Sequence, residues 1–228
     1  MGIVFFLPTR KGSERVVNKN TKPFAGIGGG LLEVKLKQLI EVKNVDEVIL
    51  STNDPESIKV AQAINSDKVR VVQRPDHLCL SSTNLQDLID YVPQITNADH
   101  IFWVHVTSPL VVATDYEKAV DVYQEQLNNH YDSLVSVSKI QQFLWDEERM
   151  EYISHDSKKL RWPRTQDLKP FYELNSAMFI NSRANYLKFN DRLGANPYKF
   201  ELGKIKSFDV DWVEDFEITE VLYQKFVL

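Results

Sequence analysis

Short apolar runs alternate, over the first 139 residues, with longer segments whose apolar residues recur at helical spacing. Five runs have strand length and end at turn residues: 3–7, 48–50, 69–72, 100–106 and 134–137. The segments between them predict helices over 31–42, from Asp54-Pro55-Glu56 to about Ile64, from a cap at Ser82 or Thr83 to Val92, and from Thr114 or Asp115 to about Gln126. This alternation predicts an α/β fold, with a Rossmann-like, mostly parallel sheet and helices on both faces.

The alternation stops at residues 140–172, a polar segment that contains two tryptophans and two prolines. We expect this segment to form an inserted arm and the whole chain, 1–228, to form a single domain. Beyond the arm, residues 177–180 and 205–210 predict two further strands, and 214–226 predicts a closing helix.

Basic residues are concentrated at the start of an otherwise acidic chain. The net charge is −5, yet residues 1–22 carry five basic side chains and a single acid, Glu14. Such a local basic loop indicates a small polyanion site, and without a longer basic block a nucleic-acid partner is not expected. A hydrophobic content of 43% and a charged content of 26% exclude a disordered or low-complexity chain.

Cysteine usage and apolar content indicate the compartment. The single cysteine, Cys79, excludes an internal disulfide and a cysteine-rich zinc site, and it is consistent with a reducing environment. No apolar stretch reaches the ~18–20 residues of a membrane span. We therefore expect a cytoplasmic protein without a membrane partner.

Three unusual segments each follow a predicted strand: 8–22, 74–83 and 107–111. Ligands of parallel sheets bind beyond the carboxyl ends of the strands. The first segment contains Arg10, Gly12, Ser13 and Lys19, whose cations and backbone amides suit phosphate oxygens. Neither the P-loop pattern nor the G-x-G-x-x-G fingerprint occurs there. The segment is therefore either an anion-binding loop of another type or a solvated basic loop.

Two carboxylates, Asp209 and Asp211, lie at the end of the predicted strand 205–210. Alternation along a strand would place both on one face, where they could share a Mg²⁺ ion. Asp211 also precedes the closing helix and is equally a candidate for its N-cap. The two roles are compatible, with one acid for each.

Several short motifs follow one another along the chain: Pro8-Thr9-Arg10-Lys11-Gly12-Ser13, Lys19-Asn20, Arg74-Pro75, Thr107-Ser108-Pro109-Leu110, Asn175 before a strand, and Asp209-Val210-Asp211. In this order, and over essentially the whole chain, they resemble the acylneuraminate cytidylyltransferases, also called CMP-sialic acid synthetases. The pair Lys19-Asn20 favours this branch over the related Kdo cytidylyltransferases, which usually have Lys-Pro there.

The resemblance implies a fold of the nucleotide-diphospho-sugar transferase type. It implies a reaction in which CTP and a nine-carbon α-keto acid sugar give a CMP-sugar and pyrophosphate. The residues implied to bind the nucleotide are Arg10, Gly12, Ser13, Lys19, Asn20, Arg74, Cys79 and Ser81. Those implied in catalysis are Lys19, Arg10 and Asp211. Nucleotidyl transfer depends mainly on positioning and charge neutralisation, which these side chains suit.

The resemblance also implies a sugar site, whose residues would be His105, Thr107, Lys139, Arg164 and Asn175. Lys139 and Arg164 border and lie on the inserted arm, which in the family reaches across a homodimer into the partner's site. Mg²⁺ would be held by Asp209 and Asp211, and Asp211 would also orient the attacking hydroxyl.

Four positions depart from the family pattern: the family usually has Gln at His105, Pro at Val106, Arg at Val111 and Asp at Ser81. We expect the nucleotide chemistry to be retained, while the identity of the acidic sugar stays open. Two alternatives remain: a nucleotidylyltransferase for Kdo or another sugar, and a degenerate relative that binds nucleotide without turnover.

Overall fold

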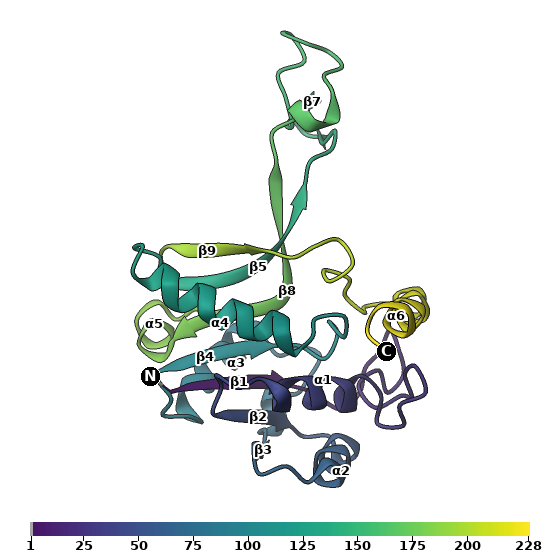
Figure 1. Ribbon diagram of the computed structural model, residues 1–228, viewed down its shortest axis with the longest axis vertical. Helices are drawn as coiled ribbons and strands as arrows, with labels where there is room; N and C mark the ends of the chain where they lie inside the picture. The colour runs from purple at the N-terminus through teal and green to yellow at the C-terminus, as the bar shows by residue number, and fades with distance from the viewer. Residues whose placement is uncertain (1) are drawn as a thin grey trace.

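A seven-stranded sheet organises the computed structural model, which describes residues 2–228 (Figure 1). The strand order is β3-β2-β1-β4-β8-β5-β9. β8 runs antiparallel to both of its neighbours, and the remaining pairs in this sheet are parallel. The strands of the sheet are β1 (Ile3–Pro8), β2 (Glu47–Thr52), β3 (Val69–Gln73), β4 (His100–Val104), β5 (Ser133–Ile140), β8 (Phe171–Ser182) and β9 (Pro197–Glu201).

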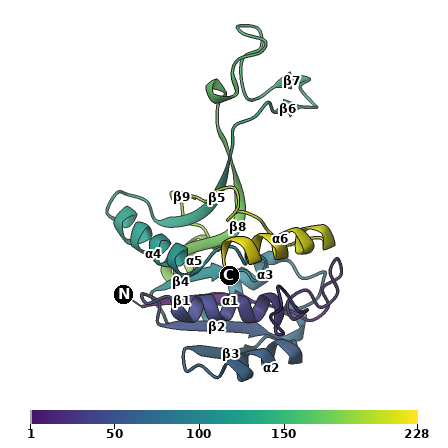
Figure 2. The same cartoon turned by 45° about the vertical axis from the view of Figure 1, so that its right-hand side comes forward.

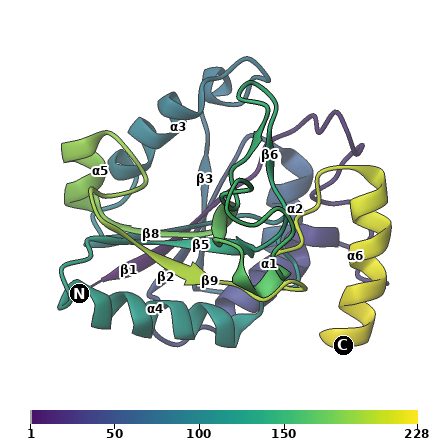
Figure 3. The ribbon, with the colours of Figure 1, turned by 90° about the horizontal axis from the view of Figure 1, so that it is seen from above.

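Helices cover both faces of the sheet, and Figure 3 shows α3 and α5 on the side opposite α1 and α4. Phe5 lies in the core beneath α1, α4 and α6, whereas Phe6 lies in the core beneath α3 and α5. Adjacent residues fall in different cores because successive strand side chains point to opposite faces. The helices are α1 (Gly30–Glu41), α2 (Pro55–Ile64), α3 (Leu85–Tyr91), α4 (Ala113–Leu127), α5 (Arg183–Phe189) and α6 (Val213–Phe226).

This architecture confirms the predicted α/β fold class. Six of the seven predicted strands overlap observed ones, and the predicted helix starts are correct for α1, α2, α4 and α6 to within two residues. The start of α2 shows why the local signals were reliable. The Asp54 carboxylate accepts a hydrogen bond from the backbone N–H of Glu56 at 3.2 Å, and Pro55 occupies the first turn.

The prediction of a strand over 205–210 is wrong. The chain makes a turn at 204–207, and Val210 forms a single backbone hydrogen bond, from its N–H to the carbonyl of Thr107 at 2.9 Å. The place beside β5 is taken instead by β9, which pairs with it in parallel. β9 buries only Phe200, so its sequence has no apolar alternation from which a strand could be predicted.

The start of α3 was predicted too early, and α5 was not predicted. The α3 N-cap is Asn84, whose side-chain oxygen accepts from the Gln86 N–H at 3.0 Å, in place of Ser82 or Thr83. α5 has only seven residues and buries only Tyr186, so it shows no helical periodicity to detect.

Within residues 140–172, called the arm from here on, the chain leaves the sheet and projects far from the body (Figures 1 and 2). The extended ends of β5 and β8 carry a small two-stranded sheet of β6 (Trp145–Asp146) and β7 (Glu151–Tyr152). The rings of Phe143, Tyr152 and Trp162 pack edge to face, with centroids 5.5–6.3 Å apart. These aromatic contacts help to stabilise the fold of the arm.

Along residues 2–228, none of the helices combines the length and the apolar character that crossing a membrane requires.

Candidate active site

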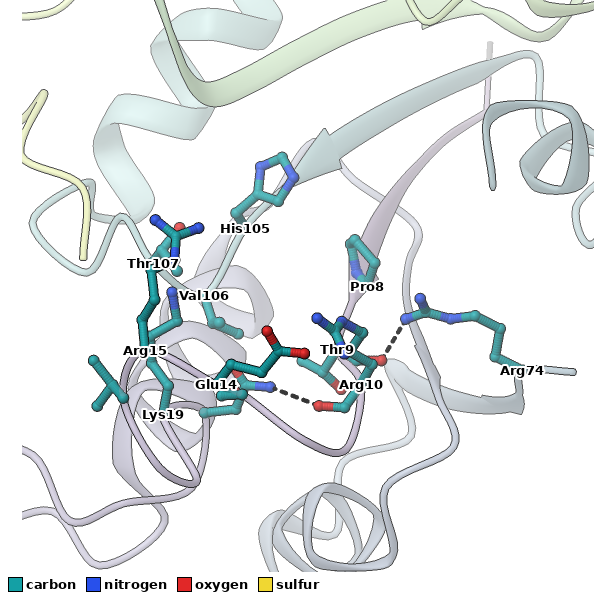
Figure 4. Close-up of a pocket in the computed structure, with 13 residues that line it drawn as sticks. Pro8, Thr9, Arg10, Glu14, Arg15, Lys19, Arg74, His105, Val106 and Thr107 are labelled. Carbon is teal, nitrogen blue, oxygen red and sulfur yellow. Dashed lines mark hydrogen bonds between the residues drawn. The ribbon is translucent and has the colours of Figure 1, made fainter. Parts of the chain in front are cut away.

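A pocket of about 330 Å³ opens beyond the carboxyl ends of β1 and β4 (Figure 4). Its walls are the loop after β1, residue 74 after β3, and residues 105–107 after β4. The structure thus brings together segments that are far apart in sequence, at the edge where ligands of parallel sheets bind. Seven of the residues singled out from the sequence line this pocket: Arg10, Ser13, Lys19, Asn20, Arg74, His105 and Thr107.

Other lining residues were missed, and some predicted ones lie elsewhere. Glu14 and Arg15 line the pocket, although the motifs assigned them no role. Their position inside the basic loop was the signal that could have identified them. The predicted residues outside the lining are Gly12, Cys79, Ser81, Lys139, Arg164, Asn175, Asp209 and Asp211.

Backbone hydrogen bonds hold the loop after β1 in shape. The Thr9 N–H donates to the carbonyl of Ser51 at 3.0 Å, and the Lys11 N–H donates to the Asn53 side chain at 3.2 Å. Gly12 has a φ of 87°, in the left-handed region that glycine adopts without steric cost. The buried Asn20 amide donates to the Arg10 carbonyl at 3.4 Å. Asn20 therefore stabilises the loop from behind.

Four cations face this pocket, Arg10, Arg15, Lys19 and Arg74, against one acid, Glu14. Lys19 is the most restrained cation of the loop, because its side chain is only 14% exposed. Its ammonium donates to the carbonyl of Val210 at 2.7 Å and lies 3.5 Å from an oxygen of Asp211. Excess positive charge next to backbone amides suits a polyphosphate.

Arg74 joins three segments behind the pocket. It is 3% exposed, and its guanidinium donates to the carbonyls of Thr9, Ser51 and Leu78. Burial lowers the pKa of this guanidinium. Arg74 therefore fixes the position of the loop after β1. Cys79, which the resemblance likewise implied to bind the nucleotide, is buried, and burial raises the pKa of its thiol.

Asp209 and Asp211 lie on an irregular segment, and they occupy different environments. Burial raises the pKa of the Asp209 carboxyl group, and the nearby Thr107 side chain acts in the opposite direction. The Oδ1 atom of Asp209 is buried without a hydrogen-bond partner among the described residues. Asp211 is 44% exposed and pairs with Arg15 at 3.2 Å.

Of the two roles left open for Asp211, the capping of the closing helix is not observed. The capping carboxylate is Asp215, whose Oδ2 accepts from the backbone N–H groups of Asp211 at 3.1 Å and Trp212 at 2.8 Å. The side chain of Asp211 is thereby left free to face the cations of the loop, Arg15 and Lys19.

Both ring nitrogens of His105 are used by the protein. The Trp103 indole N–H donates to Nε2 at 3.0 Å, and Nδ1 lies 2.7 Å from the carbonyl of Ser176. An indole can only donate, so Nε2 is unprotonated and Nδ1–H donates to the carbonyl. Burial, reinforced by the charge of Arg192, lowers the pKa of His105 to about 4. At neutral pH His105 is uncharged and has one tautomer.

A fully buried lysine lies beneath the 107–111 segment. The Lys35 ammonium donates to the carbonyls of Ser108 at 2.8 Å and Val111 at 3.1 Å, and it lies 2.7 Å from the Tyr116 hydroxyl. Burial holds the pKa of Lys35 well below its usual value. The family usually has an arginine at position 111, where this chain has an uncharged valine. Here Lys35 is the cation that organises the turn.

The remaining predicted sugar contacts lie away from the pocket lining. Asn175 is buried, and its amide oxygen and nitrogen bond Ser136 at 2.6 Å and Ser138 at 3.1 Å. Lys139 is exposed at the base of the arm. Arg164, further out on the arm, forms two hydrogen bonds to Asp167 at 2.8 and 3.2 Å.

The sheet and its cationic pocket together define a nucleotide-binding α/β protein. The sequence model of a family described as Cytidylyltransferase matches residues 4–228. The chain therefore belongs to the cytidylyltransferase family and is a nucleotidyltransferase, which confirms the resemblance carried by its motifs.

Individual relatives agree with this assignment. The chain is 24% identical over 225 residues to the pseudaminic acid cytidylyltransferase of Campylobacter jejuni, covering 96% of this chain and 94% of that protein. It is 25% identical over 230 residues to the N-acylneuraminate cytidylyltransferase of Escherichia coli, covering 98% of this chain and 52% of that protein. The chain thus spans about half the length of the second relative.

Solved structures share the fold. A CMP:2-keto-3-deoxy-manno-octonic acid synthetase complexed with CTP has a TM-score of 0.68 at 18% identity and covers 99% of both chains. A cytidylyltransferase from Leptospira borgpetersenii has a TM-score of 0.61 at 17% identity, covering 100% of this chain and 89% of that one.

Proposed function

We propose that the chain transfers a cytidylyl group from CTP to a nine-carbon α-keto acid sugar, releasing pyrophosphate. The observation that carries this proposal is the cationic pocket with two carboxylates on the adjoining segment 209–211. The names of the Campylobacter jejuni and Escherichia coli relatives, which specify pseudaminic acid and N-acylneuraminate, support a sugar of this class.

The nucleotide would bind along the loop after β1. Arg10, Ser13 and Lys19 would hold the triphosphate, with Lys19 next to the α-phosphate, where negative charge develops. Asn20 would contact the ribose. The cytosine would lie toward Arg74 and the backbone of residues 79–81, and because the Arg74 guanidinium already binds three carbonyls, we assign it the role of holding that region in place.

The two carboxylates fit a magnesium site. The buried, unpartnered Oδ1 of Asp209 needs a cation or donor, and Asp211 lies two residues away on the same segment. No cluster of three or more His, Cys, Asp or Glu that could hold a metal occurs within residues 2–228. Two carboxylates still suit Mg²⁺, which retains waters and takes phosphate oxygens as ligands. When bound, this ion would neutralise phosphate charge.

We further propose that the arm supplies sugar contacts to a composite site in a homodimer, and that the protein is cytoplasmic. Arg164 lies on a segment that projects from the body (Figure 1), so it is placed to reach a pocket of another copy. Exposed apolar residues on the arm, such as Trp162 at 63% and Leu160 at 59%, support burial against a partner. In the dimer Arg164 would exchange Asp167 for the sugar carboxylate.

The first experiment is pyrophosphate release with CTP and Mg²⁺ across N-acetylneuraminate, its deaminated analogue, legionaminic acid, pseudaminic acid and Kdo. We expect turnover with at least one nine-carbon acid. Turnover with Kdo alone, or with none of the panel despite CTP binding, would refute the proposed substrate class.

Lys19 provides the test of the catalytic pocket. Lys19→Met removes a cation positioned by Val210, and we expect kcat to fall about 100-fold. The matched control is Lys11→Met, because Lys11 is on the same loop but exposed and outside the pocket lining. Equal effects of the two substitutions would mean that only the net charge of the loop matters.

Mixing two inactive variants tests the composite site. Lys19→Met and Arg164→Ala damage different parts of the proposed site, so a mixed dimer should contain one intact site. We expect activity to reappear after the two variants are mixed and exchanged. A monomer by light scattering, or no recovery in a proven mixed dimer, would overturn the arm's role.

A further inference from the structure

Two of the predicted sugar contacts in the body of the protein, His105 and Asn175, already have hydrogen-bond partners within it. Both nitrogens of His105 are engaged, by Trp103 and Ser176. The Asn175 amide is held on both sides by β5. The wall of the pocket near His105 therefore needs another group if it is to bind a polar substituent of the sugar.

Arg192 supplies such a group. It lies in the loop after α5, where its guanidinium carbon stands 3.8 Å from the centroid of the Phe179 ring and 5.3 Å from that of Trp103. The side chain is half-buried, and burial lowers its pKa. Throughout residues 2–228, no hydrogen bond or ion pair to the Arg192 guanidinium is found.

The surroundings of Arg192 connect it to the pocket. Trp103, which it overlies, donates its indole N–H to His105, and His105 lines the pocket. The charge of Arg192 lowers the pKa of His105 more strongly than does that of Lys19, which lines the same pocket. Arg192 therefore lies next to the wall that β4 and β8 build.

The guanidinium nitrogens of Arg192 are not sealed from solvent, so a ligand could reach them from outside. Stacking on Phe179 uses the face of the guanidinium plane and leaves its N–H groups, which lie in that plane, available. Elsewhere in the chain, Arg70 shows the usual solution, with two hydrogen bonds to Glu47 at 2.6 and 2.9 Å. Within residues 2–228 no carboxylate takes that place at Arg192, so a planar oxygen acceptor of a ligand would be the matching partner.

We propose that Arg192 is a specificity-determining residue that binds a planar oxygen group of the acidic sugar, either its carboxylate or an acylamino carbonyl. The inference rests on the proposed function, because it needs an acidic sugar in this pocket. It assigns to Arg192 the polar contact that the engaged nitrogens of His105 cannot supply.

The test compares Arg192→Gln and Arg192→Lys with the wild type, using the nine-carbon acid that the wild type turns over. A lost hydrogen bond to a charged group predicts a rise in the sugar KM of about 10- to 100-fold in Arg192→Gln, with the CTP KM unchanged. Arg192→Lys keeps the positive charge but lacks the paired N–H groups of the guanidinium. Its sugar KM should therefore lie between those of the wild type and Arg192→Gln. Arg70→Gln is the matched control, because Arg70 pairs with Glu47 on the surface of β2 and β3.

The deaminated analogue, as substrate or competitive inhibitor, separates the two oxygen groups. A KM or Ki penalty that persists with this analogue assigns Arg192 to the carboxylate, and a penalty that disappears assigns it to the acylamino carbonyl. An unchanged sugar KM, or equal rises for sugar and CTP, would overturn the inference. Absence of wild-type turnover on every nine-carbon acid would instead refute the proposed function, so the two failures are distinguishable.

Discussion

Replacing Lys35 by Met tests how the turn that borders the pocket is supported. Met is similar in length, so the change removes the ammonium with little change in volume. The Ser108 carbonyl keeps a second partner, the Val111 N–H at 3.2 Å. The Val111 carbonyl and the Tyr116 hydroxyl lose their bonds to Lys35 while staying buried. The substitution therefore leaves two buried polar groups unsatisfied.

The magnitude follows from these two groups. Each unsatisfied buried group costs about 1–3 kcal/mol. Removing a desolvated charge returns part of that cost, as happens when buried charges are replaced by apolar residues. We expect Lys35→Met to lower the free energy of unfolding by about 2–4 kcal/mol.

The dependence on pH gives a second readout. Burial places the pKa of Lys35 in the folded protein well below its usual value of 10.5, so the unfolded chain holds this proton more tightly. Stability rises with pH wherever the unfolded state binds more protons. The contribution of Lys35 should therefore grow as pH rises from the folded-state pKa toward 10.5, and fall as pH decreases.

Urea unfolding of the wild type and Lys35→Met, at about pH 7 and about pH 9, measures both effects. The difference between the two proteins cancels other groups that titrate in this range. A variant as stable as the wild type, or a stability difference that shrinks as pH rises, would refute the reasoning. The carbonyl of Thr107, at the start of this turn, accepts from the Val210 N–H, and the Val210 carbonyl accepts from Lys19. We therefore expect kcat to fall as well.

Two further substitutions test local features. Gly30→Ala should lower the free energy of unfolding by at least about 2 kcal/mol, because φ is 64° and the added Cβ would lie 2.2 Å from the Lys22 carbonyl oxygen. Gly28→Ala, with nothing within 4 Å, is its control in the same urea titration and should be near neutral. Asp215→Ala should cost about 1 kcal/mol by removing the α6 cap. The exposed Glu217→Ala should cost less, and equal losses would contradict the capping role.

Much of the fold could be predicted from the sequence because its signals are local. The buried strand around Phe5 and the capped start of α2 at Asp54 depend on neighbours within a few residues. The predicted strand at 205–210 failed for a nonlocal reason: β9 occupies the sheet edge beside β5, and no periodicity near Val210 reveals that competition.

The candidate site likewise has features that the sequence predicts and features that it does not. The basic loop with Arg10 and Lys19 was visible as a cluster of charge and motif, and the pocket forms around it. The roles of individual polar atoms were not visible. Asp211 was a plausible cap, but the capping carboxylate belongs to Asp215, in the first turn of the helix. Asp209 is buried near Thr107.

From its sequence alone, this protein is an α/β cytidylyltransferase-like chain with a basic loop after its first strand, because element order and motif order are properties of adjacent residues. Tertiary structure alone decided that the nitrogens of His105 are occupied and that Arg192 lies over the ring of Trp103. Those facts depend on which distant segments meet and which donors find acceptors there. Side chains from β4, β8 and the loop after α5 meet only once the sheet has assembled.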